Sequence, residues 1–265
     1  MSVRALSTAS TGMTSLQQQI DVIANNLANV NTTGFKRLRA NFQDLFYQHV
    51  RRAGTGAASG SQLPSGIQIG HGVKLVGTDR IFAQGPLTAT ERELDLSIDG
   101  DGFYQIRQID GTTIGYTRDG TFHRDRDGNI VNNQGLFLEP SLRVPPEVTR
   151  ISVSQNGLVE GFDPANPSTP VAIGQIEIAR FSNPEGLIAQ GDNLFFESPA
   201  SGSPTVGQPG TEGRGILQQG FLESSNVESI RELTEMIQTQ RAFEMNSTTI
   251  QTADEMLQRL SNLRR

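Results

Sequence analysis

The feature that most constrains this chain is an apolar repeat that fills its first thirty residues. Eight apolar side chains follow one another at alternating intervals of three and four residues, which is the a/d pattern of a coiled-coil heptad. They are Leu6, Ala9, Met13, Leu16, Ile20, Ile23, Leu27 and Val30. The stretch contains no proline and only one glycine, Gly12. The pattern predicts one long helix with a narrow apolar stripe that packs against another helix.

A second helix is predicted at the other end, where residues 227–265 contain no glycine and no proline. Ser225 and Glu228 have the spacing of a capping box, which indicates that the helix begins there. Its apolar stripe starts with Ile230, Leu233 and Ile237 and shifts near Gln240. The stripe continues through Met236, Phe243, Ile250, Ala253, Leu257 and Leu260. We expect a long helix here, but not an uninterrupted coiled coil.

The polar faces of both predicted helices carry amides and hydroxyls where Lys and Glu would be usual. Such side chains can be buried with hydrogen bonds and without the desolvation cost of a charge. We interpret these faces as surfaces that pack against neighbouring subunits; the alternative is an ordinary solvated face. The predicted assembly interface comprises Leu6, Met13, Leu16, Ile20, Ile23, Asn25, Asn26, Leu27, Asn29, Val30, Gly34, Phe35, Ile230, Leu233, Ile237, Gln240, Phe243, Ile250, Leu257 and Leu260.

Between the predicted helices, short β runs alternate with turns. Asp110-Gly111 and Asp127-Gly128 each separate two such runs and predict hairpins. A change of phase at Gly174 predicts a β-bulge. Residues 52–66 are low in complexity, so we expect a flexible linker there, or a segment that orders only on packing. Residues 199–215 are rich in Pro, Gly and Ser and are expected to form the return linker.

These features predict an α+β fold with paired N- and C-terminal long helices, similar to a coiled coil, and an inserted antiparallel β domain. The expected helical domain comprises residues 1–32 with 226–265. The expected connecting segment comprises residues 33–72 with 199–225, and the expected β domain comprises residues 73–198.

Composition excludes several classes of function. The chain of 265 residues has no cysteine, which excludes disulfides and thiolate chemistry. Its net charge is −6 and is most negative between the predicted helices, which argues against a nucleic-acid partner. No apolar window is long enough for a transmembrane helix, and residues 1–11 lack the core of a cleaved Sec-type signal peptide. Aromatic and basic residues alternate over 35–47; this stretch is either a nucleic-acid strip or, as we prefer, an anchor against a neighbour.

The chain shows no pattern of catalytic or metal-ligating residues. Asp125–Asn129 begins like a calcium loop, but Leu136 stands at position 12, where the loop needs Glu, so a hairpin turn is favoured. His49, His71 and His123 have no paired spacing. Phosphate-loop and nucleophile-elbow motifs are absent from the sequence. We therefore expect no enzyme, no cofactor and no metal site.

Residues 24–37, Ala-Asn-Asn-Leu-Ala-Asn-Val-Asn-Thr-Thr-Gly-Phe-Lys-Arg, resemble the N-terminal signature of the axial proteins of the bacterial flagellum: rod, hook and hook-associated subunits. Further stretches resemble other motifs of the same family, namely residues 63–73, 100–104, 116–122, 219–227 and 236–244. Among the axial proteins the chain is similar to the basal-body rod proteins. The stretch over 45–73 resembles the distal rod more than the proximal rod.

The resemblance implies a structural subunit of the distal rod of the bacterial flagellar basal body. Such subunits polymerise into a hollow helical drive shaft, which transmits torque to the hook and conducts exported subunits. The implied partners are further copies of the chain, proximal rod and hook subunits, the peptidoglycan and outer-membrane ring proteins, and the flagellar type III export apparatus. The implied location is the rod, which crosses the periplasm to the outer membrane, reached without a cleaved signal peptide. The alternatives are a proximal rod or hook subunit and, more remotely, a secreted non-flagellar β-rich adhesin.

Overall fold

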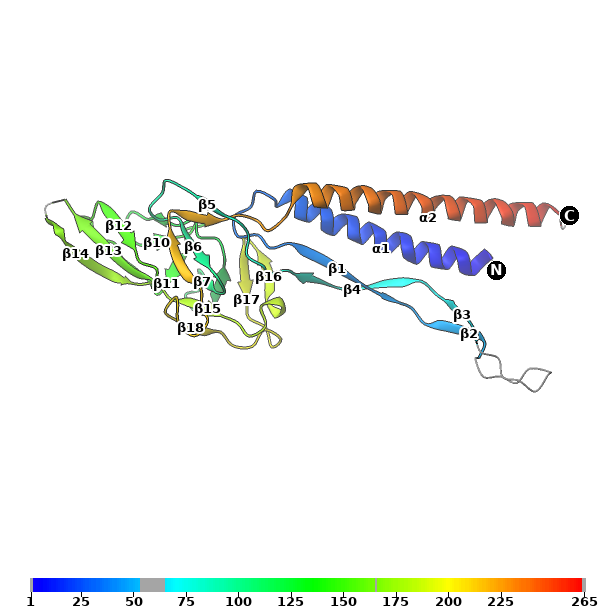
Figure 1. Cartoon of the computed structure of the whole chain (residues 1–265), viewed down its shortest axis with the longest axis horizontal. Coiled ribbons are helices and arrows are strands. Elements are labelled where there is room, and N and C mark those ends of the chain that lie inside the picture. The colour runs from blue at the N-terminus through cyan, green and yellow to red at the C-terminus, as the bar shows by residue number, and fades with distance from the viewer. Residues whose placement is uncertain (1, 53–64, 165, 264–265) are drawn as a thin grey trace. The chain divides into compact units, whose positions relative to one another are not determined.

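The computed structural model describes residues 2–52, 65–164 and 166–263. Most of the first predicted linker, residues 53–64, lies outside the described residues. The chain folds into two compact units (Figure 1). We call them the helical unit, which comprises Met1–Ala28, Leu38–Asp79 and Glu228–Arg265, and the β unit, which comprises Asn29–Arg37 and Arg80–Val227.

Two helices form where the apolar repeats predict them. α1 spans Ser2–Ala28 and α2 spans Ser229–Leu263. The first helix ends two residues before the predicted Val30, because a turn closes when the N–H of Thr32 bonds the carbonyl of Asn29 at 3.2 Å. The predicted capping box is wrong in detail. The Oγ of Ser225 accepts a hydrogen bond from the N–H of Val227 at 3.3 Å, ahead of the helix.

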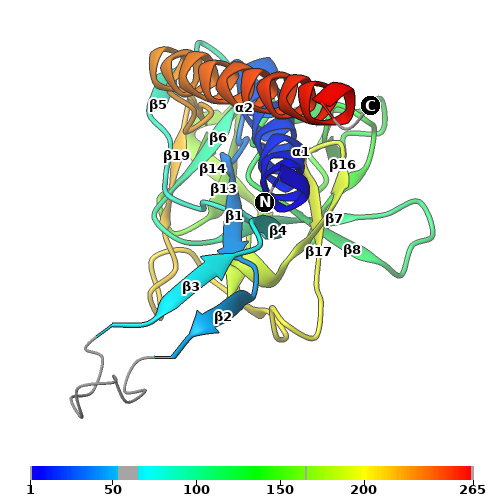
Figure 2. The same ribbon diagram turned by 90° about the vertical axis from the view of Figure 1, so that its right-hand side faces the viewer.

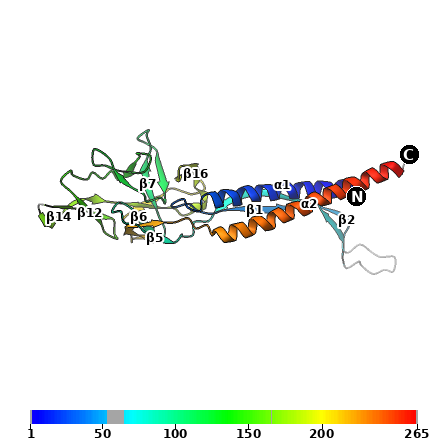
Figure 3. The same cartoon turned by 90° about the horizontal axis from the view of Figure 1, so that it is seen from above.

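The helical unit also contains a long β ribbon. β1 (Leu38–Asp44) pairs with β4 (Val73–Arg80), and β2 (Tyr47–Arg51) pairs with β3 (Ile67–Gly70). Figures 1 and 3 show α1 and α2 side by side, and Figure 2 shows the β2–β3 pair. α1 contacts both α2 and β1, so the ribbon is part of the helical unit. Most of the ribbon lies within residues 33–72, which were predicted to be a connecting segment.

The β unit is built on a sheet of nine strands. Their order is β16-β17-β8-β7-β11-β10-β9, and β15 adds β18 beside β7. The described pairings in this sheet are antiparallel. The strands are β7 (Phe103–Arg107), β8 (Ile114–Thr117), β9 (His123–Arg124), β10 (Ile130–Val131), β11 (Phe137–Glu139), β15 (Ile178–Arg180), β16 (Ile188–Gly191), β17 (Leu194–Phe196) and β18 (Thr205–Gly207).

Three smaller sheets and one 3-10 turn complete the β unit. A three-stranded sheet has the order β12-β13-β14, β6 pairs with β19, and β5 pairs with β20. The elements are β5 (Leu87–Ala89), β6 (Leu96–Asp99), β12 (Arg150–Val153), β13 (Leu158–Asp163), β14 (Asn166–Gln175), η1 (Pro184–Gly186), β19 (Ile216–Gln219) and β20 (Phe221–Glu223). Residues 199–225, expected to be connecting, thus supply β18, β19 and β20 to sheets of the β unit.

The local predictions for the β region are confirmed. β7 and β8 form the hairpin expected around Asp110-Gly111, and β9 and β10 form the one around Asp127-Gly128. The register of β13 against β14 shifts where Val159 pairs with Gly174, which is the expected bulge. The main core lies between these sheets and includes the fully buried Tyr104, Phe122 and Leu138. The α+β prediction is therefore confirmed.

Candidate assembly interface

One face of α2 packs on α1 and combines polar with apolar side chains. Its buried or half-buried positions recur at intervals of four and three residues, namely Glu232, Met236, Thr239, Phe243, Asn246, Ile250, Ala253 and Leu257. Two contacts place this face against α1. Asn26 bonds Glu232, and a Cβ on Gly12 would lie 3.2 Å from Nδ2 of Asn246. We call this face of α2 the seam; near its start, every other position is polar.

The side chain of Asn26 joins three parts of the helical unit. Its Nδ2 donates to Oε2 of Glu232 at 3.1 Å and to the carbonyl of Leu38 at 2.8 Å. Its Oδ1 accepts the N–H of Leu38 at 2.8 Å. Asn26 and Glu232 are both buried, so the amide satisfies polar groups that water does not reach. Gln19 makes a second bond between the helices, from Nε2 to Oε1 of Glu235 at 3.2 Å.

A second face of α2 is apolar and exposed. Ile230, Leu233 and Ile237 lie on it, and Ile230 is 80% exposed. A groove of about 570 Å³ runs between the helices and is lined by Leu16, Gln19, Thr234, Glu235, Gln238 and Thr239, among others. The helical unit therefore exposes an apolar stripe on α2 and a separate groove with a largely polar lining.

The β ribbon of the helical unit exposes a further apolar set. Phe46 is 90% exposed, and Tyr47, Val50, Ile67, Ile69 and Val76 are also exposed. A two-stranded ribbon is at best marginally stable alone in water. β1 packs on α1, and the exposed side chains form an apolar surface on the rest of the ribbon.

The remaining predicted interface residues divide by burial. On α1, Ile23 is buried and Asn25 is exposed. Gln240 on α2 is exposed, and the side chain of Leu260 lies outside the described residues. The half-buried ones are Leu6, Met13, Leu16, Ile20, Leu27, Asn29, Val30, Phe243, Ile250 and Leu257. Gly34 and Phe35 are buried inside the β unit, where partners from this chain surround them.

Within the β unit, a buried charged cluster surrounds Glu223. Its Oε1 accepts from Nζ of Lys36 at 2.5 Å, and its Oε2 lies 3.4 Å from Nη1 of Arg118. All three side chains are almost fully buried. Burial lowers the pKa of Lys36, and the charge of Glu223 opposes that shift. Sequence reasoning gave these residues no role. Their only signal was that Lys36 and Glu223 stand in two separate stretches that resemble family motifs.

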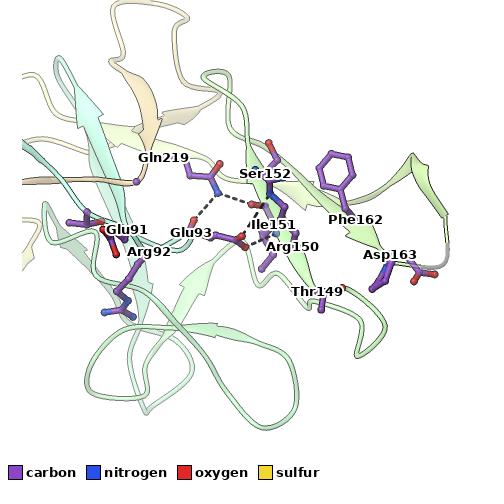
Figure 4. Close-up of a pocket in the computed structure, with 13 residues that line it drawn as sticks. Glu91, Arg92, Glu93, Thr149, Arg150, Ile151, Ser152, Phe162, Asp163 and Gln219 are labelled. Atoms are coloured by element: carbon purple, nitrogen blue, oxygen red, sulfur yellow. Dashed lines mark hydrogen bonds and ion pairs between the residues drawn. The ribbon is translucent and has the colours of Figure 1, made fainter.

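A cavity of about 690 Å³ lies beside β12, at the edge of the three-stranded sheet (Figure 4). The carboxylate of Glu93 accepts the N–H of Ile151 at 2.9 Å. The side-chain amide of Gln219 accepts the N–H of Val153 at 3.1 Å and donates to the carbonyl of Ile151 at 2.8 Å. These bonds occupy the free edge of β12 and prevent a further strand from pairing there.

The comparisons with known proteins identify the family. Three family models match: "Flagella basal body rod protein" at residues 6–36, "Flagellar hook protein FlgE/F/G D1 domain" at residues 97–161, and "Flagellar basal body rod FlgEFG protein C-terminal" at residues 218–263. The flagellar basal-body rod protein FlgG of Borreliella burgdorferi is 49% identical over 266 residues, which cover 99% of each chain. The chain belongs to the flagellar basal-body rod protein family.

Two further flagellar proteins match 99% of this chain. The FlgG protein of Caulobacter vibrioides is 46% identical over 263 residues, which cover 99% of this chain and all of that protein. The flagellar hook-basal body complex protein FlhP of Bacillus subtilis is 29% identical over 275 residues. The resemblance seen in residues 24–37 is thereby confirmed. The N- and C-terminal rod models also cover Lys36 and Glu223, the two ends of the buried pair.

Two further observations bear on what a rod-family chain of this sequence can bind. Among the described residues, no group of three or more His, Cys, Asp or Glu side chains is placed to hold a metal ion. No described helix combines the length and apolar character that a membrane crossing requires.

Proposed function

We propose that this protein is a structural subunit of the distal rod of the bacterial flagellar basal body, with no catalytic role. In this proposal it polymerises into a hollow helical shaft that transmits torque to the hook and conducts exported subunits. Similarity to FlgG proteins at 41–49% identity over nearly the full length supports the distal rod over other axial positions. The lower identity to FlhP, 29%, agrees with this choice.

The observation that supports the proposal most is that α2 has two faces with apolar side chains, of which only one is packed within the chain. One face already packs on α1, yet Ile230, Leu233 and Ile237 remain exposed on another. Ile230, Leu233 and Ile237 are 80%, 45% and 51% exposed, so burying what remains would contribute about 3–5 kcal/mol per subunit, at about 1.5–3 kcal/mol for each fully exposed side chain. A neighbouring copy of the chain is the partner that supplies a matching helix at every repeat of a helical array.

The proposed shaft arises when the terminal helices continue their packing from copy to copy as nested coiled coils around a channel. In this proposal the exposed and half-buried members of the predicted interface on α1 and α2 form that contact, with Asn25 and Gln240 supplying uncharged polar groups. In this proposal the subunit leaves the cytoplasm through the flagellar export apparatus. In the periplasm it meets proximal rod and hook subunits and the peptidoglycan and outer-membrane rings.

Charge insertion into the exposed stripe tests the proposal. A strain whose own copy of the gene is deleted would receive the wild-type chain, Ile230→Glu or Ile237→Glu. Ile109→Glu is the matched control, because Ile109 is 93% exposed in the β unit. We expect swimming and complete basal bodies with the wild type and with Ile109→Glu, and neither with the two stripe variants. A deletion strain that still swims contradicts the proposal.

The same strain separates the alternatives. Basal bodies can be stripped stepwise and each fraction analysed by mass spectrometry. A distal rod subunit remains with the rod after the hook is removed, whereas a hook subunit leaves with the hook. Recovery in the innermost rod fraction alone indicates a proximal rod subunit. A secreted adhesin would be absent from every basal-body fraction.

A further inference from the structure

Three short segments of the β unit contain all the points at which the chain passes to or from the helical unit. The chain passes between the units after residues 28, 37, 79 and 227. The corresponding segments of the β unit are residues 29–37, 80–85 and 223–227. Any force carried along the chain between the units must pass through them.

We propose that Glu223 and Asn226 are positioning residues that clamp these three segments into one load-bearing joint. The inference rests on the proposed function, because a rod that transmits torque must carry force between the parts of each subunit. The joint lies wholly within the β unit. It comprises these two residues, Lys36, Arg118 and the backbone that they bond.

Glu223 bonds the other two segments at once. Its Oε1 accepts from Nζ of Lys36 at 2.5 Å and from the N–H of Gly85 at 2.9 Å. Its backbone carbonyl accepts the N–H of Gly34 at 2.8 Å. Lys36 adds a bond from Nζ to the carbonyl of Ala83 at 2.8 Å. The carboxylate of Glu223 and the ammonium of Lys36 thus connect residues 36, 83, 85 and 223, and the carbonyl of Glu223 adds residue 34.

Asn226, three residues after Glu223, also bonds both of the other segments. Its Oδ1 accepts the N–H of Arg37 at 2.7 Å. Its Nδ2 donates to the carbonyls of Ile81 and Ala83, both at 2.9 Å. Its own N–H bonds the carbonyl of Phe35 at 3.4 Å. The side-chain amide therefore uses its acceptor and its donors on the other two segments.

Arg118 connects the joint to the main sheet. It follows β8, lies 3.4 Å from Glu223, donates to the carbonyl of Gly100 at 2.8 Å and stacks over Phe103. Gly34 passes so close to it that a Cβ there would lie 2.7 Å from the carbonyl carbon of Arg118. Arg80, the first residue of the second segment, stacks over both Phe35 and Phe195.

The burial of these charges favours a positioning role over simple stabilisation. A fully buried ion pair gains little stability over well-packed apolar residues, because desolvation offsets the attraction. Such a pair does fix the distance between its two side chains and their orientation. Without the joint, the nine residues of segment 29–37 could stretch toward about 30 Å under load, at about 3.3–3.6 Å per residue. With it, three segments resist together.

The test uses the full chain with Glu223→Gln or Asn226→Ala in the deletion strain. Glu139→Gln is the control, because Glu139 pairs with Arg107 at 2.7 Å elsewhere in the β unit. In the purified variants we expect amide exchange about tenfold faster at residues 34–37 and 81–85, with β7 and β8 unchanged. In cells we expect assembled rods and normal rotation of tethered beads at low load, with rotation lost as viscous load rises.

Wild-type rotation at every load in both variants overturns the inference, whatever the exchange rates. If Glu223→Gln does not fold, Asn226→Ala decides, since it removes hydrogen bonds without leaving a buried charge unpaired. Lys36→Met should lose the load tolerance, whereas Lys36→Arg, which keeps the positive charge, should retain part of it. The proposed function fails separately: in that case the wild-type chain itself does not restore rods.

Discussion

Asn26 on α1 donates a hydrogen bond of 3.1 Å to Glu232 on α2, and both side chains are buried. A polar pair inside a helix seam fixes the register of the two helices, because any sliding leaves buried polar groups without their partners. The same amide also binds the backbone of Leu38 at the start of the β ribbon. Asn26 therefore sets how α1, α2 and β1 align within the helical unit.

Replacing Asn26 should weaken the helical unit more than replacing a solvent-facing amide. Asn26→Ala leaves the carbonyl and N–H of Leu38 and one bond of Glu232 unmet, at about 1–3 kcal/mol. We expect isolated rods of this variant to dissociate at lower urea concentration. Gln17→Ala, at an exposed position of α1, is the control and should leave the urea midpoint unchanged. Equal urea midpoints for both variants would show that Asn26 does not set the alignment of α1, α2 and β1.

Two glycines with similar backbone angles separate conformational strain from steric clash. Gly34 has φ of 68° and its Cβ would lie 2.7 Å from the backbone of Arg118, whereas Gly111 has φ of 73° and open space around it. Gly111→Ala should cost about 1 kcal/mol of unfolding free energy. Gly34→Ala should cost at least about 2 kcal/mol more, because backbone must move. Urea unfolding of the free subunit followed by circular dichroism measures both, and equal losses would exclude the clash.

The tip of the β7–β8 hairpin should respond to acid through Asp110. Hydrogen bonds from the side chain and N–H of Thr113 lower the pKa of Asp110 to about 2. The folded-state pKa lies below the ordinary value, so the stabilising contribution is complete above pH 3.8 and is lost as the pH falls toward 2. NMR titration of the Thr112 and Thr113 amides should show this transition. Asp110→Asn should abolish it, and an unchanged titration in that variant would refute the assignment.

The buried hydroxyl of Tyr104 should lower the unfolding free energy of the β unit. Burial raises the pKa of Tyr104 well above 10, and its hydroxyl is one of the buried side-chain groups without a hydrogen-bond partner in the described part of the chain. Its folded-state pKa is raised, so its contribution is complete below pH 10 and is lost as the pH rises beyond that value. Tyr104→Phe should raise the unfolding free energy by about 1 kcal/mol at neutral pH. It should also weaken the alkaline loss of stability; a destabilised Tyr104→Phe protein would indicate a partner for the hydroxyl.

Local patterns were readable in the sequence because they depend on neighbours along the chain. The heptad spacing of α1 predicts a helix, and Asp110-Gly111 predicts a hairpin. The faces of α2 were only partly predictable. Glu232, Thr239 and Asn246 occupy seam positions, so a search for apolar residues alone missed the seam and merged it with the exposed stripe of Ile230 and Ile237.

The joint was beyond sequence reasoning for a different reason. Lys36 and Glu223 are 187 residues apart, and nothing in their local sequence indicates that they meet. The strands of the β ribbon were also obscured, because residues 45–72 separate β1 from β4 along the chain. Pairing of distant segments depends on tertiary packing, which periodicity does not encode.

If the protein is a rod subunit, α1 and α2 owe their stable fold to neighbouring copies of the chain. Amide hydrogen exchange on dilute free subunit and on isolated rods tests it most directly. We predict fast exchange over residues 2–28 and 229–263 in the free subunit, strong protection of the same residues in the rod, and protection of the β unit in both. Protection of the two helices in the free subunit equal to that of the β unit would contradict the account.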